Sequence, residues 1–122
     1  RCKRLSANRK MKMGEVERRT GLKAGMIRFY EHEGVSTPAE RTQFKGYRSF
    51  TEKHVRELRF IAQMASLGFK IEEIKRLKAL EARIDPESVA ARNEILAKRN
   101  AVLDKEIADR QRTKETVLSL MQ

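Results

Sequence analysis

Arg28 and Tyr30 are the residues whose types and spacing point most directly to chemistry at a surface. They stand in the segment MIRFYEHEGV, residues 26–35, among side chains suited to burial. If this segment is helical, Ile27 packs inward, Arg28 faces outward, and Tyr30 lies close enough to join Arg28 through its hydroxyl. A guanidinium can bind a guanine edge or a phosphate, and a phenol can donate to a phosphate. A nucleic-acid contact is one interpretation, and an ordinary surface arginine is the other.

The residue types that catalysis or metal binding needs are sparse. The chain has one cysteine, Cys2, and two histidines, His32 and His54, which fall in different predicted elements. We expect both histidines on solvated faces. Soft and borderline metals need several convergent thiolates or imidazoles. The sequence therefore predicts no enzyme, no cofactor and no metal site, and its cysteine usage is typical of a reducing, cytoplasmic compartment.

The positive charge lies in the first two-thirds of the chain. The net charge is +11: residues 1–12 carry six basic groups and no acid, residues 13–80 carry 14 basic and 9 acidic groups, and residues 81–122 carry eight of each. Such a distribution favours a polyanion partner, with nucleic acid first. We interpret residues 1–12 as a basic leader or a tag remnant. No apolar run approaches 18 residues, so we expect no membrane partner.

The helices and strands that position Arg28 can be predicted from the glycines that end them and from the spacing of apolar residues. Two short helices separated by a turn, a helix-turn-helix, are predicted over residues 13–21 and 24–33. In the second helix, one face holds Met26, Ile27 and Tyr30. Phe29 is expected either in the core or in contact with the wing that follows. The turn at 45–46 divides residues 35–51 into a small two-stranded wing. Thr51 caps a third helix that ends at Gly68, and a fourth amphipathic helix follows.

A long helix is predicted over residues 86–121. Asp85 is a good N-cap, Pro86 suits the first helical position, and nothing after Pro86 breaks the helix. Its length reaches about 50 Å. A sparse apolar stripe is too narrow for an intramolecular core, so we expect it to pair with the same helix of a second copy, parallel or antiparallel. The predicted dimer interface is Val89, Leu96, Leu103, Ile107 and Val117.

The ordered motifs resemble the MerR family of bacterial transcription regulators. They are Gly14-Glu15, Thr20-Gly21-Leu22, Ile27-Arg28-Phe29-Tyr30-Glu31, Gly46-Tyr47-Arg48, Leu67-Gly68-Phe69 and Glu72-Glu73-Ile74. The resemblance implies a mainly α fold: a winged helix-turn-helix DNA-binding domain, 13–81, followed by a long dimerisation helix, 86–121, in an antiparallel coiled coil. It also implies a homodimer that binds a palindromic promoter element and bends and untwists the spacer, acting on RNA polymerase through the promoter.

The same resemblance assigns DNA contacts to the recognition helix and the wing. The predicted set is Lys23, Arg28, Tyr30, Arg41, Lys45, Tyr47 and Arg48. Some positions depart from the family pattern. Lys23-Ala24-Gly25 replaces the usual Ser or Thr cap, and Ser88 stands where divalent-metal sensors carry a cysteine, so the effector is left open. Two alternatives remain: a coiled-coil interaction protein whose winged helix no longer binds DNA, and an architectural protein of the excisionase type.

Overall fold

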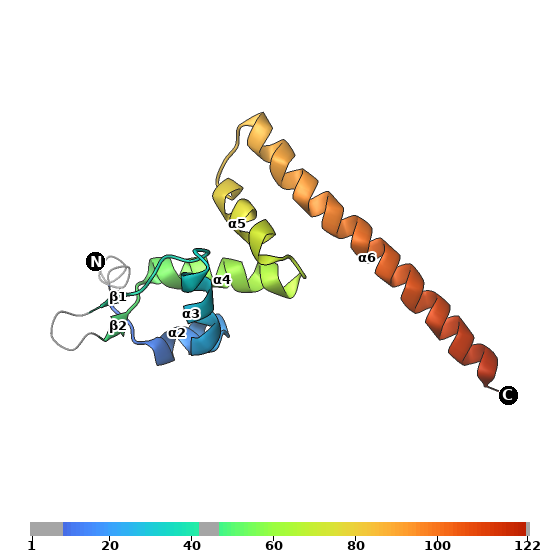
Figure 1. Cartoon of the computed structure of the whole chain (residues 1–122), viewed down its shortest axis with the longest axis horizontal. Coiled ribbons are helices and arrows are strands. Elements are labelled where there is room, and N and C mark those ends of the chain that lie inside the picture. The colour runs from blue at the N-terminus through green and yellow to red at the C-terminus, as the bar shows by residue number, and fades with distance from the viewer. Residues whose placement is uncertain (1–8, 42–46, 122) are drawn as a thin grey trace. The chain divides into compact units, whose positions relative to one another are not determined.

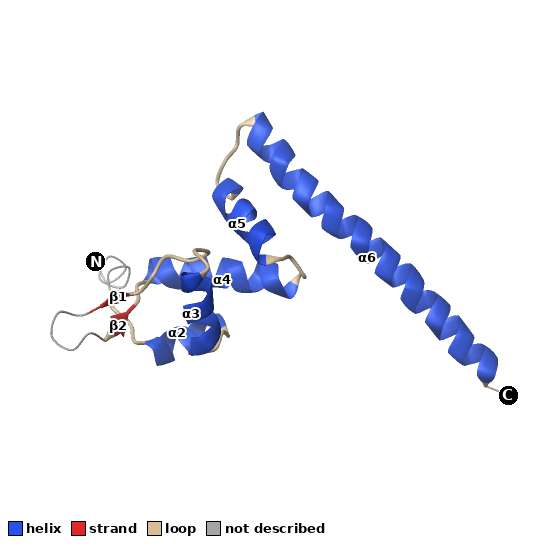
Figure 2. Ribbon diagram, in the orientation of Figure 1, coloured by secondary structure: helices blue, strands red, loops and turns tan. Residues whose placement is uncertain are grey.

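The computed structural model describes residues 9–41 and 47–121 of the chain, and most of them are helical (Figure 1). Figure 2 shows the helices with a small sheet near the start. The elements in chain order are α2 (Met13–Thr20), α3 (Ala24–His32), β1 (Glu40–Arg41), β2 (Arg48–Ser49), α4 (Glu52–Ser66), α5 (Ile71–Leu80) and α6 (Pro86–Leu120). The chain forms two compact units, one up to Lys78 and one from Ala79 onward. The predicted order of helix pair, wing, two helices and long helix is confirmed.

The core of the first unit is mainly aliphatic, as expected for a chain without tryptophan, and includes a few aromatic rings. Helix α2 packs against α3 and α4. The turn between α2 and α3 begins at Gly21, whose φ of 78° is a left-handed conformation that glycine adopts without a steric penalty. Buried apolar side chains recur at helical spacing along these elements, and the largest ones that are fully buried are Phe50, Ile27, Leu58, Ile61, Ile74, Val16, Val35 and Val55. This core fixes the orientation of α3.

The wing is a two-stranded antiparallel sheet with an additional bridge. Strand β1 pairs with β2 in the register Glu40↔Ser49 and Arg41↔Arg48. Met11 bridges Phe50 through two backbone hydrogen bonds of 2.7 and 2.8 Å. Met11 is only 2% exposed, although we had placed it in the leader. Its side chain is buried where the extended segment meets the sheet, so the folded unit begins before residue 13.

Helix α4 begins at Thr51, as predicted, and its first turn contains a buried histidine. The Nδ1 atom of His54 accepts the Thr51 backbone N–H at 3.0 Å, and Nε2 lies 3.1 Å from the carbonyl oxygen of Pro38. His54 is only 6% exposed. The expectation of a solvated face is wrong for this residue, because the imidazole satisfies the start of the helix and the preceding loop together. The two contacts suit a ring that accepts at Nδ1 and donates from Nε2.

The second unit is dominated by α6. Its N-cap is Asp85, whose side chain accepts the Ser88 N–H at 3.0 Å, and a proline opens the first turn, as predicted. The guanidinium of Arg92 donates to the carbonyl oxygens of Leu80, at 2.7 Å, and Arg83, at 3.1 Å. These bonds satisfy carbonyls at the end of α5 and fix the first turns of α6. None of the described helices is both long and apolar enough to span a membrane.

Candidate nucleic-acid interface

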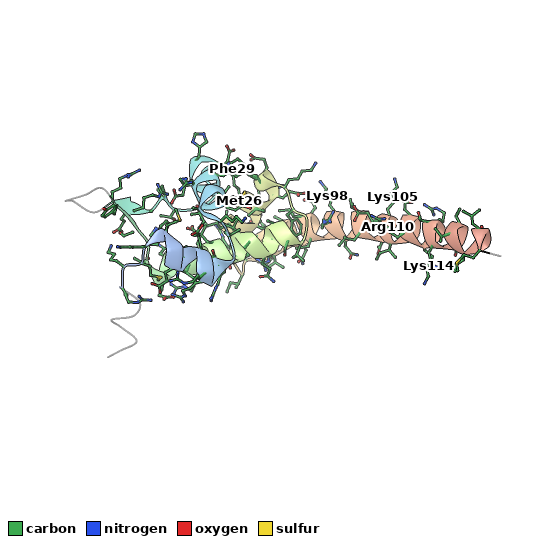
Figure 3. The ribbon with its side chains drawn as sticks, turned by 90° about the horizontal axis from the view of Figure 1, so that it is seen from below. Met26, Phe29, Lys98, Lys105, Arg110 and Lys114 are labelled. Atoms are coloured by element: carbon green, nitrogen blue, oxygen red, sulfur yellow. The ribbon has the colours of Figure 1, made fainter. Side chains whose placement is uncertain are left out.

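Helix α3 has one buried side and one exposed side. Ile27 is fully buried, whereas Arg28 is exposed, as the sequence predicted. Met26 and Phe29 are 41% and 42% exposed, and Figure 3 shows both on this helix. The predictions that Met26 shares the buried face and that Phe29 lies in the core are therefore wrong. Ile27 and Tyr30, three positions apart, fill the inward side, and the turn of 100° per residue carries Phe29 away from it, whereas Met26 lies at its edge.

Tyr30 belongs to the core of the first unit. The residue is 4% exposed, and burial raises the pKa of its phenol. Its ring centroid lies 5.8 Å from that of Phe29 in a tilted arrangement. Tyr30 lies on the buried face with Ile27, as the helical spacing predicted, and its ring packs in the core. A hydrogen bond from its hydroxyl to DNA stays a prediction.

The exposed side of α3 and the wing together border a concave surface. We name it the basic cleft; it has a volume of about 570 Å³ and is lined by Lys12, Met13, Gly14, Arg28, Arg41, Tyr47 and Arg48. Four predicted DNA-contacting residues therefore lie together: Arg28, Arg41, Tyr47 and Arg48. Lys23 is exposed at the start of α3 but does not line the cleft, and Lys45 lies outside the described residues.

Lys12 is a cation of the basic cleft that sequence reasoning missed. Its ammonium group lies 6.0 Å from the ring centroid of Tyr47, a geometry in which a cation is attracted to the ring face. Lys12 is exposed beside the buried Met11. This alternation along an extended segment was the available signal, but it was hidden within a run that we interpreted as a leader.

Arg48 connects the wing to α3. Its Nη2 atom forms an ion pair with Oε1 of Glu31, and the other carboxylate oxygen of Glu31 accepts the Ala39 N–H at 2.8 Å. The side chain of Glu31 is 9% exposed and that of Arg48 is 23% exposed. The Arg48 guanidinium also lies 5.9 Å from the Phe50 ring centroid. Arg48 therefore has a structural role that the sequence did not indicate, and its contact with DNA stays a prediction.

The start of α3 is capped by α2 rather than by its own N-cap residue. Lys23 makes no side-chain capping bond, and Oε2 of Glu17 accepts the Ala24 N–H at 2.7 Å. The carboxylate also brings a negative charge to the positive end of the helix dipole. A Cβ built at Gly25 meets nothing within 4 Å. Glu17 thus supplies the cap that the Lys23-Ala24-Gly25 sequence lacks.

A second pair of charged residues fixes α2 to α4. The guanidinium of Arg19 binds both carboxylate oxygens of Glu52, with Nη2 at 2.9 Å from Oε1. The side-chain hydrogen bond from Arg19 lowers the pKa of Glu52 below its ordinary value. In addition, Nε of Arg59 donates to the backbone oxygen of Arg19 at 2.8 Å. Side chains of α4 therefore hold α2 through both the guanidinium and the backbone carbonyl of Arg19.

The long helix α6 presents apolar side chains to solvent. Among the predicted dimer residues, Val89 is half-buried, and the others are exposed by 37% to 65%: Leu96, Leu103, Ile107 and Val117. A groove on the helix is lined by Leu103, Glu106, Ile107, Arg110, Gln111 and Lys114. Across the described parts of the chain, no group of three or more His, Cys, Asp or Glu residues could hold a metal ion.

Two family models match the chain. The model described as "MerR HTH family regulatory protein" matches residues 11–81, and the one described as "MerR, DNA binding" matches residues 55–120. The first begins at the buried Met11, in agreement with the structure. Together the two matches cover the helix-turn-helix, the wing and the whole of α6.

Curated proteins and solved structures of the same kind are similar to the chain. The HTH-type transcriptional regulator CueR of Salmonella typhimurium is 34% identical over 110 residues, which cover 90% of this chain and 78% of that protein. CueR of Yersinia pestis is 43% identical over 70 residues, 57% of this chain but only half of that protein. The structure of HiNmlR, a MerR family regulator lacking the sensor domain and bound to promoter DNA, matches with a TM-score of 0.63 at 21% identity, covering 91% of this chain and 86% of that one. This last likeness shows the fold.

Proposed function

Because the chain belongs to the MerR family of DNA-binding transcription regulators, we propose that it acts as a homodimer on a palindromic promoter element. The basic cleft is the observation that carries this proposal, since it brings four cations and a tyrosine from four separate stretches of the chain to one concave surface. Members of this family are regulators and not enzymes. Each subunit would occupy one half-site, because a two-fold protein dimer matches a two-fold DNA sequence.

Within one half-site, α3 is the recognition helix. Arg28 is exposed at its centre and has no ion-pair partner among the described residues, so it can donate both guanidinium edges to a guanine in the major groove. Lys12, Arg41 and Tyr47 border the same cleft and are suited to phosphates on either side, contacts that set register rather than sequence preference. Lys23, exposed at the start of α3, is a further phosphate contact.

Control of transcription would follow from deformation of the DNA. Two DNA-binding units joined through their long helices can hold both half-sites at once, and the phosphate contacts on each side offset the cost of bending and untwisting the spacer. RNA polymerase would then respond to the altered promoter geometry. The support for this step is the family relationship together with a cleft built for the DNA backbone.

Binding of a specific duplex by Arg28→Ala tests the recognition helix. We expect a loss of about 1–3 kcal/mol for a specific palindromic duplex and a relaxed preference at one base pair of each half-site. Arg76→Ala is the matched control: Arg76 is an exposed arginine on α5, so its replacement removes the same charge at a position outside the cleft. Gel-shift titrations at fixed salt measure both. Equal binding by parent and Arg28→Ala would contradict the placement of α3, and no binding of any duplex by the parent would favour the coiled-coil interaction alternative.

Sedimentation of Leu103→Asp tests the dimer. Leu103 lines the groove on α6, and a charged carboxylate buried against a partner helix costs several kcal/mol, so this variant should be monomeric at concentrations where the parent is dimeric. Val102→Asp is the matched control: Val102 is 47% exposed and follows the same helix, but it does not line the groove. A monomeric parent, or equal effects of the two substitutions, would contradict dimerisation through this stripe.

A further inference from the structure

The exposed side of α3 carries apolar surface that the proposed DNA contacts do not use. Met26 and Phe29 are both exposed, and Figure 3 labels the two residues on this helix. They stand three positions apart, so they are neighbours on the helix surface. We name these two side chains, together with the bare backbone of Gly25, the α3 patch. Single exposed apolar residues are ordinary on a protein surface, so the surroundings of the patch must identify its ligand.

The ring of Phe29 is supported on one side and open on another. Its centroid lies 5.8 Å from that of the buried Tyr30 in a tilted arrangement, so a ring of the core holds it in place. Aromatic side chains in a helix lean toward the N-terminal end, over the residues three and four positions earlier. For Phe29 those residues are Met26 and Gly25. Because Gly25 brings no side chain to this turn, one flank of the ring stays open to a ligand.

Neither the backbone nor the packing of α3 requires a glycine at position 25. Gly25 is helical, it is not among the glycines with a positive φ, and a Cβ built on it meets nothing within 4 Å. Glycine inside a helix is less stable than alanine. Its common use is a close approach of the backbone to a ligand. The open space around Gly25 therefore indicates that a ligand approaches α3 beside the Phe29 ring.

The charges around the α3 patch favour DNA as this ligand. Arg28, next to Phe29 in the chain, lines the basic cleft, and Lys23 is exposed at the start of the helix. The acidic side chain within α3 is Glu31, which is only 9% exposed and is held by Arg48. Apolar surface bordered by cations, without a free carboxylate of the same helix, suits a polyanion that also presents apolar groups. The major groove of DNA has both properties.

The apolar group that the major groove presents is the methyl group on C5 of thymine. Cytosine has a hydrogen at this position, and 5-methylcytosine has the same methyl group as thymine. We propose that Phe29 is a specificity-determining residue that binds the C5-methyl group of a pyrimidine, in the same half-site as the guanine bound by Arg28. The inference rests on the proposed function, because it requires α3 to lie in the major groove.

The size of the effect follows from the area that one methyl group buries. Loss of a buried methyl group weakens binding by about fourfold in each half-site, and by about 15-fold for a palindrome in which both half-sites lose it. A methyl group is uncharged, so this factor should be the same at low and high salt. A phosphate contact would instead change the salt dependence of binding. The two kinds of contact are therefore distinguishable in one titration series.

Replacement of thymine by uracil in the bound duplex tests the assignment, because it removes only the methyl group. The parent chain first selects a palindromic duplex from a random library. Each symmetry-related pair of thymines is then replaced by deoxyuridine, and gel-shift titrations at two salt concentrations give the ratio of thymine to uracil affinity. At one pair this ratio should be about 15 for the parent. Phe29→Ala and Phe29→Gln should bring it close to one.

The ratio is measured with one protein on two duplexes, so a general loss of affinity cancels. Phe29→Gln keeps a long side chain with high helix propensity, so it answers the question if Phe29→Ala folds poorly. Leu67→Ala is the matched control: Leu67 is 46% exposed at the end of α4, and its replacement removes apolar surface outside α3. Its thymine-to-uracil ratio should equal that of the parent.

Cytosine at the same pair distinguishes the methyl group from the rest of the base. The parent should bind the 5-methylcytosine duplex more tightly than the cytosine duplex by a similar factor, and Phe29→Gln should bind the two equally. Equal binding of these duplexes by the parent would overturn the assignment to the methyl group.

The remaining outcomes separate this inference from the proposed function. If the parent binds its selected duplex but no thymine pair is sensitive, or if the Phe29 variants keep the parent ratio, the assignment of Phe29 is overturned and the proposed function stands. Phe29 variants that bind every duplex as the parent does would place the α3 patch against a protein partner instead. A parent chain that selects no duplex overturns the proposed function, and this inference with it.

Discussion

Glu17→Ala should loosen the start of the recognition helix α3 without changing any residue proposed to contact DNA. Oε2 of Glu17 is 2.7 Å from the Ala24 amide nitrogen, and Lys23 makes no side-chain bond of its own at this helix start. Removing a side-chain cap costs about 0.5–2 kcal/mol. For a domain of this size, each kcal/mol lowers the melting temperature by about 4–8 °C. We therefore expect the melting temperature, measured by circular dichroism, to fall by about 2–16 °C.

DNA binding gives the second measurement for Glu17. Loss of an acidic residue strengthens non-specific binding slightly, because less negative charge opposes the phosphates. Fraying of the first turn of α3 moves Arg28 and weakens specific binding, so the ratio of specific to non-specific affinity should fall. Glu17→Gln removes the same charge but keeps an amide oxygen that can accept the Ala24 N–H. The Glu17→Gln protein should lie between the parent and Glu17→Ala, both in stability and in the ratio of specific to non-specific affinity.

Two results would refute this account of the α3 start. One is a Glu17→Ala protein with the same melting temperature and the same ratio of specific to non-specific DNA affinity as the parent. The other is Glu17→Gln as damaging as Glu17→Ala, which would mean that charge rather than the hydrogen bond is what matters. Glu33→Ala controls for the loss of a carboxylate near α3, since Glu33 makes no side-chain hydrogen bond within the described residues and lies at the other end of the helix.

Three further perturbations test neighbouring parts of the first unit. Gly25→Ala should raise stability by about 0.5–1 kcal/mol in a urea titration, because its Cβ meets nothing within 4 Å, whereas Gly21→Ala should lower it, because φ is 78° there. Glu31→Ala should cost about 1.5–3 kcal/mol by removing the acceptor for Arg48 and the Ala39 N–H, and a near-neutral effect would contradict that link. Burial alone raises the pKa of Glu57, but bonds from Lys78 and Thr37 outweigh burial and lower this pKa. The stability that these bonds contribute is therefore present above the unfolded pKa of about 4.3 and is lost as pH falls through the lower pKa of the folded state. Glu57→Gln should make the free energy of unfolding less dependent on pH in this acidic range.

The helices and their order could be predicted because local signals determine them. Thr51 and Asp85 cap helix starts through hydrogen bonds with residues three positions on, and Pro86 suits the first helical position. Spacing of apolar residues identifies the buried faces of α4 and α5. The wing was predictable for a similar reason, since two β-prone runs stand on either side of Lys45-Gly46 in the sequence. What these signals share is that the partner lies nearby in the sequence.

Features that depend on distant partners escaped prediction. His54 is buried because it bonds both its own helix start and Pro38, sixteen residues earlier. Met11 is buried because it pairs with Phe50, and nothing in a basic run of residues indicates such a partner. For Phe29 the sequence left two places open, the core or a contact with the next element, and the core place is wrong because Tyr30 and not Phe29 is buried. An aromatic pair at adjacent helical positions must point in different directions, and the sequence does not say which of the two points inward.

The cations of the first unit divide into two groups that act on DNA binding in different ways. Arg19 and Arg48 are held by carboxylates that join elements of the fold, whereas Arg28 has no such partner within the described residues. Only a cation that replaces counterions at a phosphate changes the salt slope of binding. Arg48 must release Glu31, wholly or in part, before it can do so. Replacing Arg48 should therefore weaken binding chiefly by loosening the wing, by a similar factor at low and high salt. Lys12 lines the same cleft and has no carboxylate partner among the described residues, so it should account for more of the salt slope than Arg48 does.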